Sequence, residues 1–351
     1  MKKNILAAII AVAAMASAFA GCNPDTDKPT PTEAATTENV EAAATETNEP
    51  VSTETAENTE EVVNPTDKPK CAVLDFNECA EEVLRLKPYK AEWGQLPEDF
   101  AGDTVLYVQA DGTWFGPAWF ATDGETIAVN DIADRLIIYN NGELNHFDKM
   151  CLSYDDYACM SGDYVYSSLE KINILTGEIE AKLSKPEDVS FVGAYGFTTE
   201  KNGTPKAICF DHNERLSDEE FKWAYYYNFM ELDSDNTWKD RGEAFNSKEL
   251  FANDDARVSL SNGAEWIAKG HSPECIGIDA DNCYYFLYFN EEQFGITKVD
   301  SDGNFISQVA IPDEIAENLW DPRYCYNLLP DGTVYISAAM NDAYVIWKIN
   351  M

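Results

Sequence analysis

The chain has 351 residues, with 63 acidic side chains against 25 basic ones and a formal net charge of −38 at pH 7. This balance excludes nucleic acid and anionic lipid surfaces as expected partners, because binding to phosphate needs clustered Lys and Arg. High negative charge by itself keeps a protein soluble, so it does not imply a partner.

The N-terminus has the layout of a secretory signal peptide. Lys2 and Lys3 precede an apolar run, Ile5–Met15, that is short for a membrane-spanning helix. The following small residues end in Phe19-Ala20-Gly21-Cys22, which resembles the bacterial lipobox, although that family usually has Leu where Phe19 stands. The resemblance implies a signal peptide over residues 1–21 and a diacylglycerol on the thiol of Cys22. An ordinary cleaved signal is the alternative.

Residues 22–70 are predicted to be a disordered acidic tether. From residue 23 to residue 70 there is no aromatic residue and no Leu, Ile or Met, and twelve acids face three lysines. Such a stretch cannot bury enough apolar surface to offset its chain entropy. Similar Thr/Glu/Pro-rich spacers occur in surface lipoproteins of Gram-positive bacteria. With the lipobox, this implies a protein held on the cell membrane by its N-terminal lipid and facing outside, at the cell surface or, in a Gram-negative host, in the periplasm or outer membrane.

The remainder, residues 71–351, carries 20 basic and 51 acidic residues and suits one large all-β domain or two smaller ones. Residues 71–103 are expected to be a lead-in containing a short helix, over residues 74–87, that packs on the outside of the domain. The eight cysteines after Cys22 show no spacing typical of zinc sites. An even count in an exported protein allows disulfides, but the sequence does not fix their pairing.

Tight turns of the Asp-Gly or Asn-Gly kind recur along the domain. Five of them, near residues 124, 162, 203, 281 and 332, each precede an alternating β-rich run. These dipeptides favour hairpins because the turn needs residues with positive φ. A second set, at Asn141-Gly142, Thr176-Gly177 and Asp302-Gly303, closes a further hairpin downstream. The sequence therefore predicts repeated hairpins.

The spacing of the first set is 38, 41, 78 and 51 residues, and the interval of 78 is close to two repeats with a poorly marked one around residue 240. Six units of about 40 residues, with four strands each, fit a β-propeller. The pattern resembles propellers of the YVTN/NHL kind. The resemblance implies an all-β fold with a six-bladed propeller over residues 104–351. Five or seven blades, and an open β-sandwich, remain alternatives.

The ends of the domain predict how the ring closes. The final unit stops after its third strand, Val345–Ile349, and an unpaired stretch, Thr104–Val108, precedes the first unit. We expect this N-terminal strand to complete the last blade, because closure removes the exposed edges of the sheet.

Catalytic motifs are not evident. The domain has three histidines, His146, His212 and His271, and none lies in a metalloprotease or nucleophile-elbow motif. Acid pairs such as Asp155-Asp156 could serve a glycosidase, but 51 acids make adjacent pairs common, and these pairs fall in predicted turns. We predict no catalytic residue, no cofactor and no metal site.

Aromatic residues are the remaining signal for function. A minority of the Trp and Tyr residues fall where inner strands of the blades begin. The candidate ligand-binding residues are Trp119, Tyr157 and Tyr324, with Arg323 and His271 nearby. An aromatic mouth with a polar rim could stack a sugar ring or hold a partner peptide.

These features favour a non-enzymatic binding or scaffold protein whose ligand is a glycan or a protein. The alternative is an extracellular glycan-active hydrolase or lyase with carboxylates in the channel. A third class is an accessory factor of an envelope assembly that makes contacts through the sides of its blades. The inner strands discriminate between the first two, because convergent acids would favour an enzyme and an apolar or aromatic lining would favour binding.

Overall fold

The computed structural model describes residues 71–92, 103–110, 113–133, 135–148, 158–185, 194–217, 222–246, 257–259, 265–267, 274–289, 294–319 and 325–351. These residues belong to one compact unit, Pro69–Met351. No helix within these ranges is long and apolar enough to cross a membrane.

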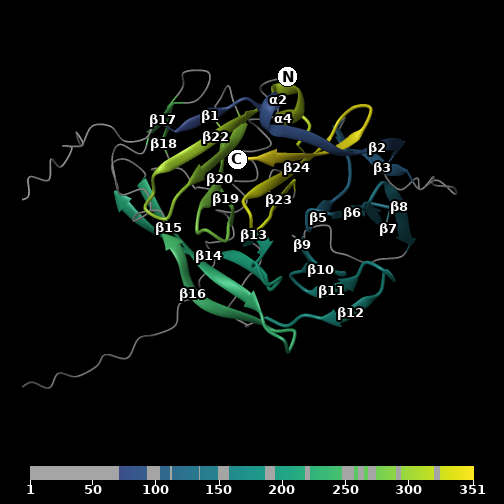
Figure 1. The fold of residues 1–351 in the computed structure, drawn as a ribbon, viewed down its shortest axis with the longest axis horizontal. Coiled ribbons are helices and arrows are strands. Elements are labelled where there is room, and N and C mark those ends of the chain that lie inside the picture. The colour runs from purple at the N-terminus through teal and green to yellow at the C-terminus, as the bar shows by residue number, and fades with distance from the viewer. Residues whose placement is uncertain are drawn as a thin grey trace, which may run out of the picture. The chain divides into compact units, whose positions relative to one another are not determined.

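Five sheets form the blades of a β-propeller (Figure 1). Blade 1 contains β5 (Trp119–Thr122), β6 (Thr126–Asp131), β7 (Arg135–Asn140) and β8 (Glu143–Asp148). Blade 2 contains β9 (Ala158–Ser161), β10 (Tyr164–Ser167), β11 (Glu170–Asn173) and β12 (Ile179–Lys182). Blade 3 contains β13 (Ala194–Thr199), β14 (Pro205–Ser217), β15 (Lys222–Leu232) and β16 (Trp238–Asn246).

The last two blades include strands from the N-terminal part of the unit. Blade 4 contains β19 (Glu274–Ile278), β20 (Tyr284–Phe289), β21 (Phe294–Val299) and β22 (Phe305–Ile311), with β1 (Ala72–Leu74) added in parallel to β22. Blade 5 contains β23 (Tyr326–Leu328), β24 (Thr333–Ala339) and β25 (Tyr344–Asn350), followed by β2 (Ala80–Glu92), β3 (Thr104–Ala110) and β4 (Thr113–Phe115). Outside the blades lie the hairpin of β17 (Arg257–Ser259) and β18 (Glu265–Ile267) and the one-turn helices α2 (Phe76–Cys79) and α4 (Asp313–Ala316).

The inner strands close into a ring. Strands β5, β9, β13, β19 and β23 lie against one another in chain order, and β23 returns against β5. Asn327 on β23 joins three blades, because its amide nitrogen donates to the carbonyl oxygen of Ala158 at 3.0 Å and its side-chain oxygen accepts from the backbone of Thr122 at 3.4 Å. The hydroxyl of Thr198 donates to the carbonyl oxygen of Leu328 at 2.7 Å. The predicted propeller is therefore confirmed.

Each turn of the first predicted set joins the first two strands of a blade. In blade 1, Oδ1 of Asp123 accepts from the backbone nitrogens of Glu125 and Thr126 at 3.0 and 2.8 Å. Gly124 has φ +99°, a conformation that costs glycine little because it has no Cβ. Local turn chemistry thus places the hairpins, as the sequence predicted.

The predicted blade number of six is wrong, because the described residues form five blades. The interval of 78 residues between turns does not hold two units. It includes the unusually long strands β14 and β15, of 13 and 11 residues. The turn near residue 240, between Leu232 and Trp238, joins β15 to β16 within blade 3. The long strands and the stretch between β16 and β19, whose described residues form no blade of their own, together account for the doubled spacing.

An N-terminal strand does complete the last blade, but it is not the predicted one. Strand β25 pairs antiparallel with β2, with Leu86 opposite Tyr344 and Leu84 opposite Ile346. The predicted stretch, Thr104–Val108, lies one strand further out, in β3, which pairs in parallel with β2. Closure therefore uses a segment that precedes the predicted one.

The helix expected over residues 74–87 is wrong for most of that range. Only Phe76–Cys79 is helical, and Ala80–Glu92 is the long strand β2. Leu84 and Leu86 are buried on either side of exposed Arg85, which is the alternation of a strand. Pairing with β25 overrides the helix propensity of the Glu, Leu and Arg residues in this segment.

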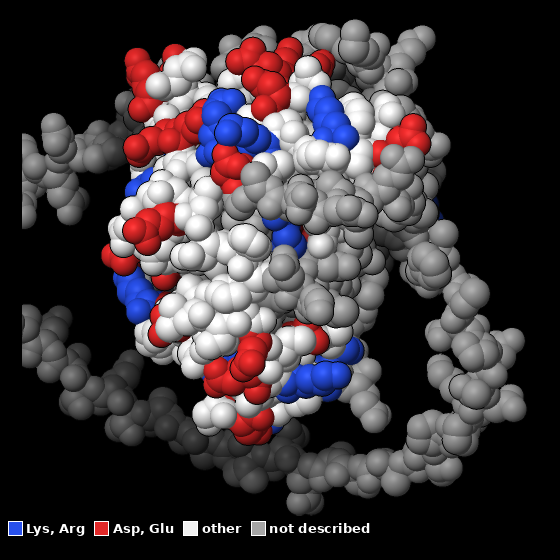
Figure 2. All heavy atoms as spheres, turned by 90° about the vertical axis from the view of Figure 1, so that its right-hand side faces the viewer, with Lys and Arg blue, Asp and Glu red and all other residues white. Residues whose placement is uncertain are grey.

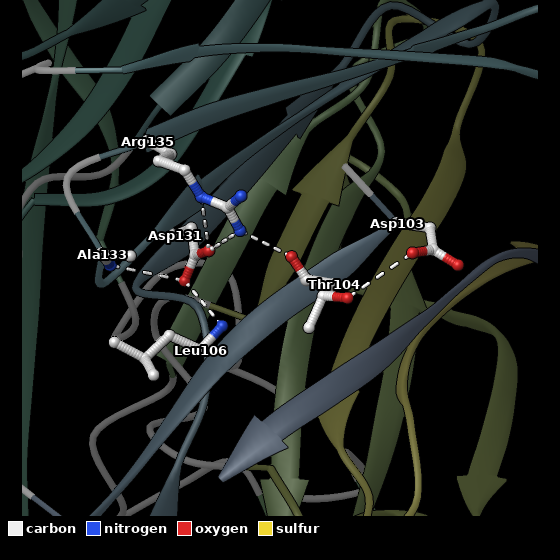
Figure 3. A network of polar contacts seen from close by, with 6 residues as sticks. All are labelled: Asp103, Thr104, Leu106, Asp131, Ala133 and Arg135. Carbon is white, nitrogen blue, oxygen red and sulfur yellow. Dashed lines mark hydrogen bonds and ion pairs between the residues drawn. The ribbon is translucent and has the colours of Figure 1, made fainter. Parts of the chain in front are cut away.

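A buried ion pair joins blade 1 to β3 (Figure 3). Nη2 of Arg135 lies 2.7 Å from Oδ2 of Asp131 and donates to the carbonyl oxygen of Thr104 at 2.6 Å. Oδ1 of Asp131 accepts from the backbone nitrogen of Leu106 at 3.0 Å. Both charged side chains are at most 4% exposed. The pair therefore fastens the N-terminal strands to the first blade.

Candidate functional site

The two ends of the ring differ. At one end lie the turns between the first and second strands of the blades, and neighbouring turns interlock. A Cβ at Gly332 of blade 5 would stand 2.4 Å from Oη of Tyr285 in blade 4. A Cβ at Gly203 of blade 3 would stand 2.5 Å from Oγ of Ser161 in blade 2. These turns can approach so closely because they carry glycine.

The axis itself is packed at the level of the inner strands. A Cβ at Gly196 on β13 would lie 2.6 Å from the backbone oxygen of Ile276 on β19. A Cβ at Gly277 would lie 2.5 Å from the side chain of Leu328 on β23. The described side chains of the inner strands are apolar, aromatic, hydroxyl, thiol or amide groups. These contacts leave little space between the inner strands at this level.

The opposite end is where the inner strands begin, and Trp119, one of the predicted ligand residues, lies there. Trp119 is the first residue of β5 and is 1% exposed. Its indole packs in the cluster that joins blade 1 to Ala158 and Met160 of blade 2. The ring of Trp119 is thus part of the core and not an open stacking platform. Four other candidates, Tyr157, His271, Arg323 and Tyr324, and the predicted lipidation site, Cys22, lie outside the described residues.

Asn130 is a residue at this end that the sequence did not single out. It pairs directly with Trp119 across β5 and β6 and is 2% exposed. Within the described part of the chain, neither Nε1 of Trp119 nor Nδ2 of Asn130 has a hydrogen-bond acceptor. No sequence pattern marks Asn130, because only the strand register places its unpaired amide opposite Trp119.

The β14–β15 hairpin extends toward the same end, since β14 runs away from the interlocked turns. The ring of His212 stacks on Tyr226 at a centroid distance of 4.2 Å and an interplanar angle of 6°. Nδ1 of His212 lies 2.6 Å from Oδ2 of Asp211, and the hydroxyl of Tyr226 donates to Glu214 at 2.9 Å. The side chains of Asp211 and His212 are both exposed. Together these side chains form an aromatic and acidic surface at this end of blade 3.

Charge does not single out a patch among the described residues on the face drawn in Figure 2. Among the residues coloured in Figure 2, acidic and basic side chains are interspersed with uncharged ones. Within the described ranges, no group of three or more His, Cys, Asp or Glu side chains is arranged to hold a metal ion.

The seven described cysteines are free thiols, so none of the disulfides that the even count allows forms among them. Burial raises the pKa of Cys159, Cys209 and Cys275 to about 12. Cys79 and Cys283 are only partly buried. The described cysteines therefore include both buried and partly buried thiols.

We expect these classes to react at different rates with iodoacetamide in the native protein at pH 8. Cys79 and Cys283 should be alkylated first. Cys159 and Cys275 should react about 100-fold more slowly or not at all. The thiolate is the nucleophile, and burial both lowers the fraction of thiolate and blocks access of the reagent to the sulfur. Timed labelling followed by peptide mass spectrometry measures the rates, with denatured protein as the control. Equal rates for all four thiols would contradict the packing described here.

No family model matches the sequence, and no curated protein matches it. Among solved structures, the chain is similar to a candidate oxidoreductase (glucose dehydrogenase) from Thermus thermophilus, with 10% identity, a TM-score of 0.33, and coverage of 66% of this chain and 96% of that one. It is also similar to a quinoprotein alcohol dehydrogenase-like protein from Bacteroides thetaiotaomicron, with 12% identity, a TM-score of 0.30 and coverage of 57% of each chain. A calcium-binding regucalcin from Agrobacterium tumefaciens shares 11% identity with a TM-score of 0.27, over 66% of this chain and 75% of its own. Similarities this weak assign no family or function, and the propeller is defined by the strand pairing of this chain.

Proposed function

We propose that this chain is a lipid-anchored, extracytoplasmic β-propeller that binds a glycan or protein ligand at the end of the ring where the inner strands begin. In this proposal it acts as a binding or scaffold protein and not as an enzyme. The observation that supports it is the packed axis, in which Gly196, Gly277 and Asn327 bring the inner strands together. Inner strands packed in this way leave little room along the axis for channel carboxylates to flank a bond.

Binding is tested with the soluble unit, residues 69–351, on a glycan array and on immobilised envelope proteins. We expect saturable binding in one of the two experiments, with the ligand recovered chemically unchanged. Failure to bind in both experiments would contradict a binding function. Recovery of a cleaved ligand would instead favour the alternative hydrolase or lyase.

The lipid anchor is tested separately with Cys22→Ser, because only the cysteine thiol can accept the diacylglycerol. In bacteria fed labelled palmitate, we expect the natural chain to be labelled and to sediment with membranes. The variant should lose the label and be released from the membrane fraction by washing. Cys71→Ser, which keeps Cys22, is the matched control and should behave like the natural chain. Persistent labelling of Cys22→Ser would rule out this anchor.

A further inference from the structure

Trp119 and Asn130 present two buried hydrogen-bond donors that have no acceptor within the described part of the chain. They face each other across β5 and β6, are 1% and 2% exposed, and adjoin an apolar cluster that includes Ala128, Leu136 and Met160. Nearly all buried donors in proteins are paired, because an unpaired one loses its bonds to water without replacement. Two such donors side by side call for an explanation.

The fold can satisfy a buried indole, as Trp238 shows. Trp238 is 0% exposed, and its Nε1 donates to the carbonyl oxygen of Ser168 at 3.1 Å. Trp238 thus provides a matched contrast to Trp119. The two side chains have the same chemistry and nearly the same burial, but the indole of Trp119 has no acceptor among the described residues.

A third unpaired group lies at this end of the ring. The hydroxyl of Tyr107 on β3 is buried and has no partner among the described residues. Tyr107 lies beside Gly116, three residues before Trp119, since a Cβ at Gly116 would be 3.1 Å from its ring. At the interlocked end the hydroxyl of Tyr285 donates to Asp279 at 2.9 Å, although the buried hydroxyl of Ser307 has no partner among the described residues. The unpaired donors of Trp119, Asn130 and Tyr107 thus lie at the end that the proposed function uses.

We propose that the Trp119–Asn130 pair receives an uncharged oxygen of a saccharide ligand, which would supply the missing acceptor. This inference rests on the proposed function and deepens it by naming the ligand class. The donors are neutral, and the net charge of −38 disfavours anionic ligands. The two donor atoms are inaccessible in the structure, so the ligand must displace the groups that cover them. Hydroxyl and acetamido oxygens protrude from a sugar ring and are small enough to enter the space that this displacement opens.

The first measurement is thermal unfolding of the soluble unit carrying Trp119→Phe or Trp238→Phe. Both substitutions remove an indole N–H and leave a similar small void. Trp119→Phe removes an unpaired donor, whereas Trp238→Phe removes a hydrogen bond to the carbonyl oxygen of Ser168. We therefore expect Trp119→Phe to have a clearly higher Tm than Trp238→Phe. Equal losses of Tm would show that Trp119 already has an acceptor, such as an internal water, and would overturn the proposal.

The second measurement is binding to an array of uncharged glycans, followed by titration of the strongest glycan. We expect affinity to fall at least tenfold in Trp119→Phe and in Asn130→Leu, and to be unchanged in Trp238→Phe. Asn130→Leu keeps the branched heavy-atom skeleton of the side chain and serves if Trp119→Phe does not fold. Full affinity in both Trp119→Phe and Asn130→Leu would overturn the proposed site.

The outcomes separate this inference from the proposed function. Binding to envelope proteins but to no glycan would overturn the saccharide inference and leave a binding function. Binding to neither would overturn both. Glycan binding that ignores Trp119 and Asn130 would support the proposed function and reject this site.

Discussion

Arg135→Met should destabilise the propeller by about 3–5 kcal/mol, because it leaves the carboxylate of Asp131 buried without its counter-charge. Asp131 is 0% exposed, and the substitution also removes the bond from Arg135 to the carbonyl oxygen of Thr104. Chemical denaturation of residues 69–351 measures the loss. The control is Arg85→Met, which breaks an equally short ion pair, with Glu82, whose side chains are 50% and 40% exposed. That exposed pair should contribute less than about 1 kcal/mol.

The loss should also depend on pH. Burial raises the pKa of Asp131 above its ordinary value, and Arg135 and backbone donors oppose that rise. Without Arg135, the pKa of the folded state should rise further above that of the unfolded chain. The folded variant then holds a proton that the unfolded chain releases, so its stability falls as the pH rises above the ordinary Asp value of about 3.9. We expect the variant to be closer to the natural chain at pH 5 than at pH 8. A deficit independent of pH would mean that Asp131 stays ionised in the variant.

The hairpins were predictable from sequence because their chemistry is local. Oδ1 of Asp331 accepts from the backbone of Thr333 at 2.9 Å, and Gly332 between them has φ +84°. Oδ1 of Asp300 likewise accepts from the backbone of Asp302 at 2.9 Å. An Asp followed by Gly or another turn residue determines such a turn wherever it lies in the chain.

Blade number and closure were not predictable in the same way, because they depend on contacts distant in sequence. The spacing of turns depends on the lengths of strands and connections as well as on the number of blades. The long hairpin of β14 and β15 and the stretch between β16 and β19 together doubled one interval. Strand β2 has residues that favour a helix, and only its pairing with β25 makes it a strand. The sequence pattern could indicate a ring closed by the N-terminus without identifying the strand that closes it.

In the candidate site, too, the sequence predicted a local feature but not the contacts that depend on residues distant in the chain. The position of aromatic residues at the starts of inner strands indicated Trp119 as a candidate, and the structure places it at the expected end of blade 1. Its burial depends on packing against Met160 of the next blade, and its partner Asn130 becomes visible only in the strand register. Sequence could therefore point to the position but not to the unpaired donors.

Removing the N-terminal strands should abolish folding, even though the turn-defined repeats begin later in the chain. A chain that begins at Thr104 keeps every inner strand but lacks β1 and β2, which leaves β22 and β25 with exposed edges. We expect this chain to be insoluble or to unfold without a cooperative transition, whereas one that begins at Pro69 should unfold in a single step. Circular dichroism during heating distinguishes the two.

A point substitution tests the same closure in a chain that still folds. Leu86 on β2 is 0% exposed and packs with Val105, Tyr344 and Ile346. Leu86→Ala should therefore cost about 2–5 kcal/mol through lost burial and the cavity that remains. Val73→Ala, at a 50% exposed position on β1, is the control and should change stability by less than about 0.5 kcal/mol.

The opposite result would change the account of closure. If Leu86→Ala were as mild as Val73→Ala, or if the chain from Thr104 folded normally, β3 would have to be able to replace β2. Strand β3 runs parallel to β2, so that replacement would keep the antiparallel pairing with β25. Closure would then depend on any strand of the correct direction, and not on β2 itself.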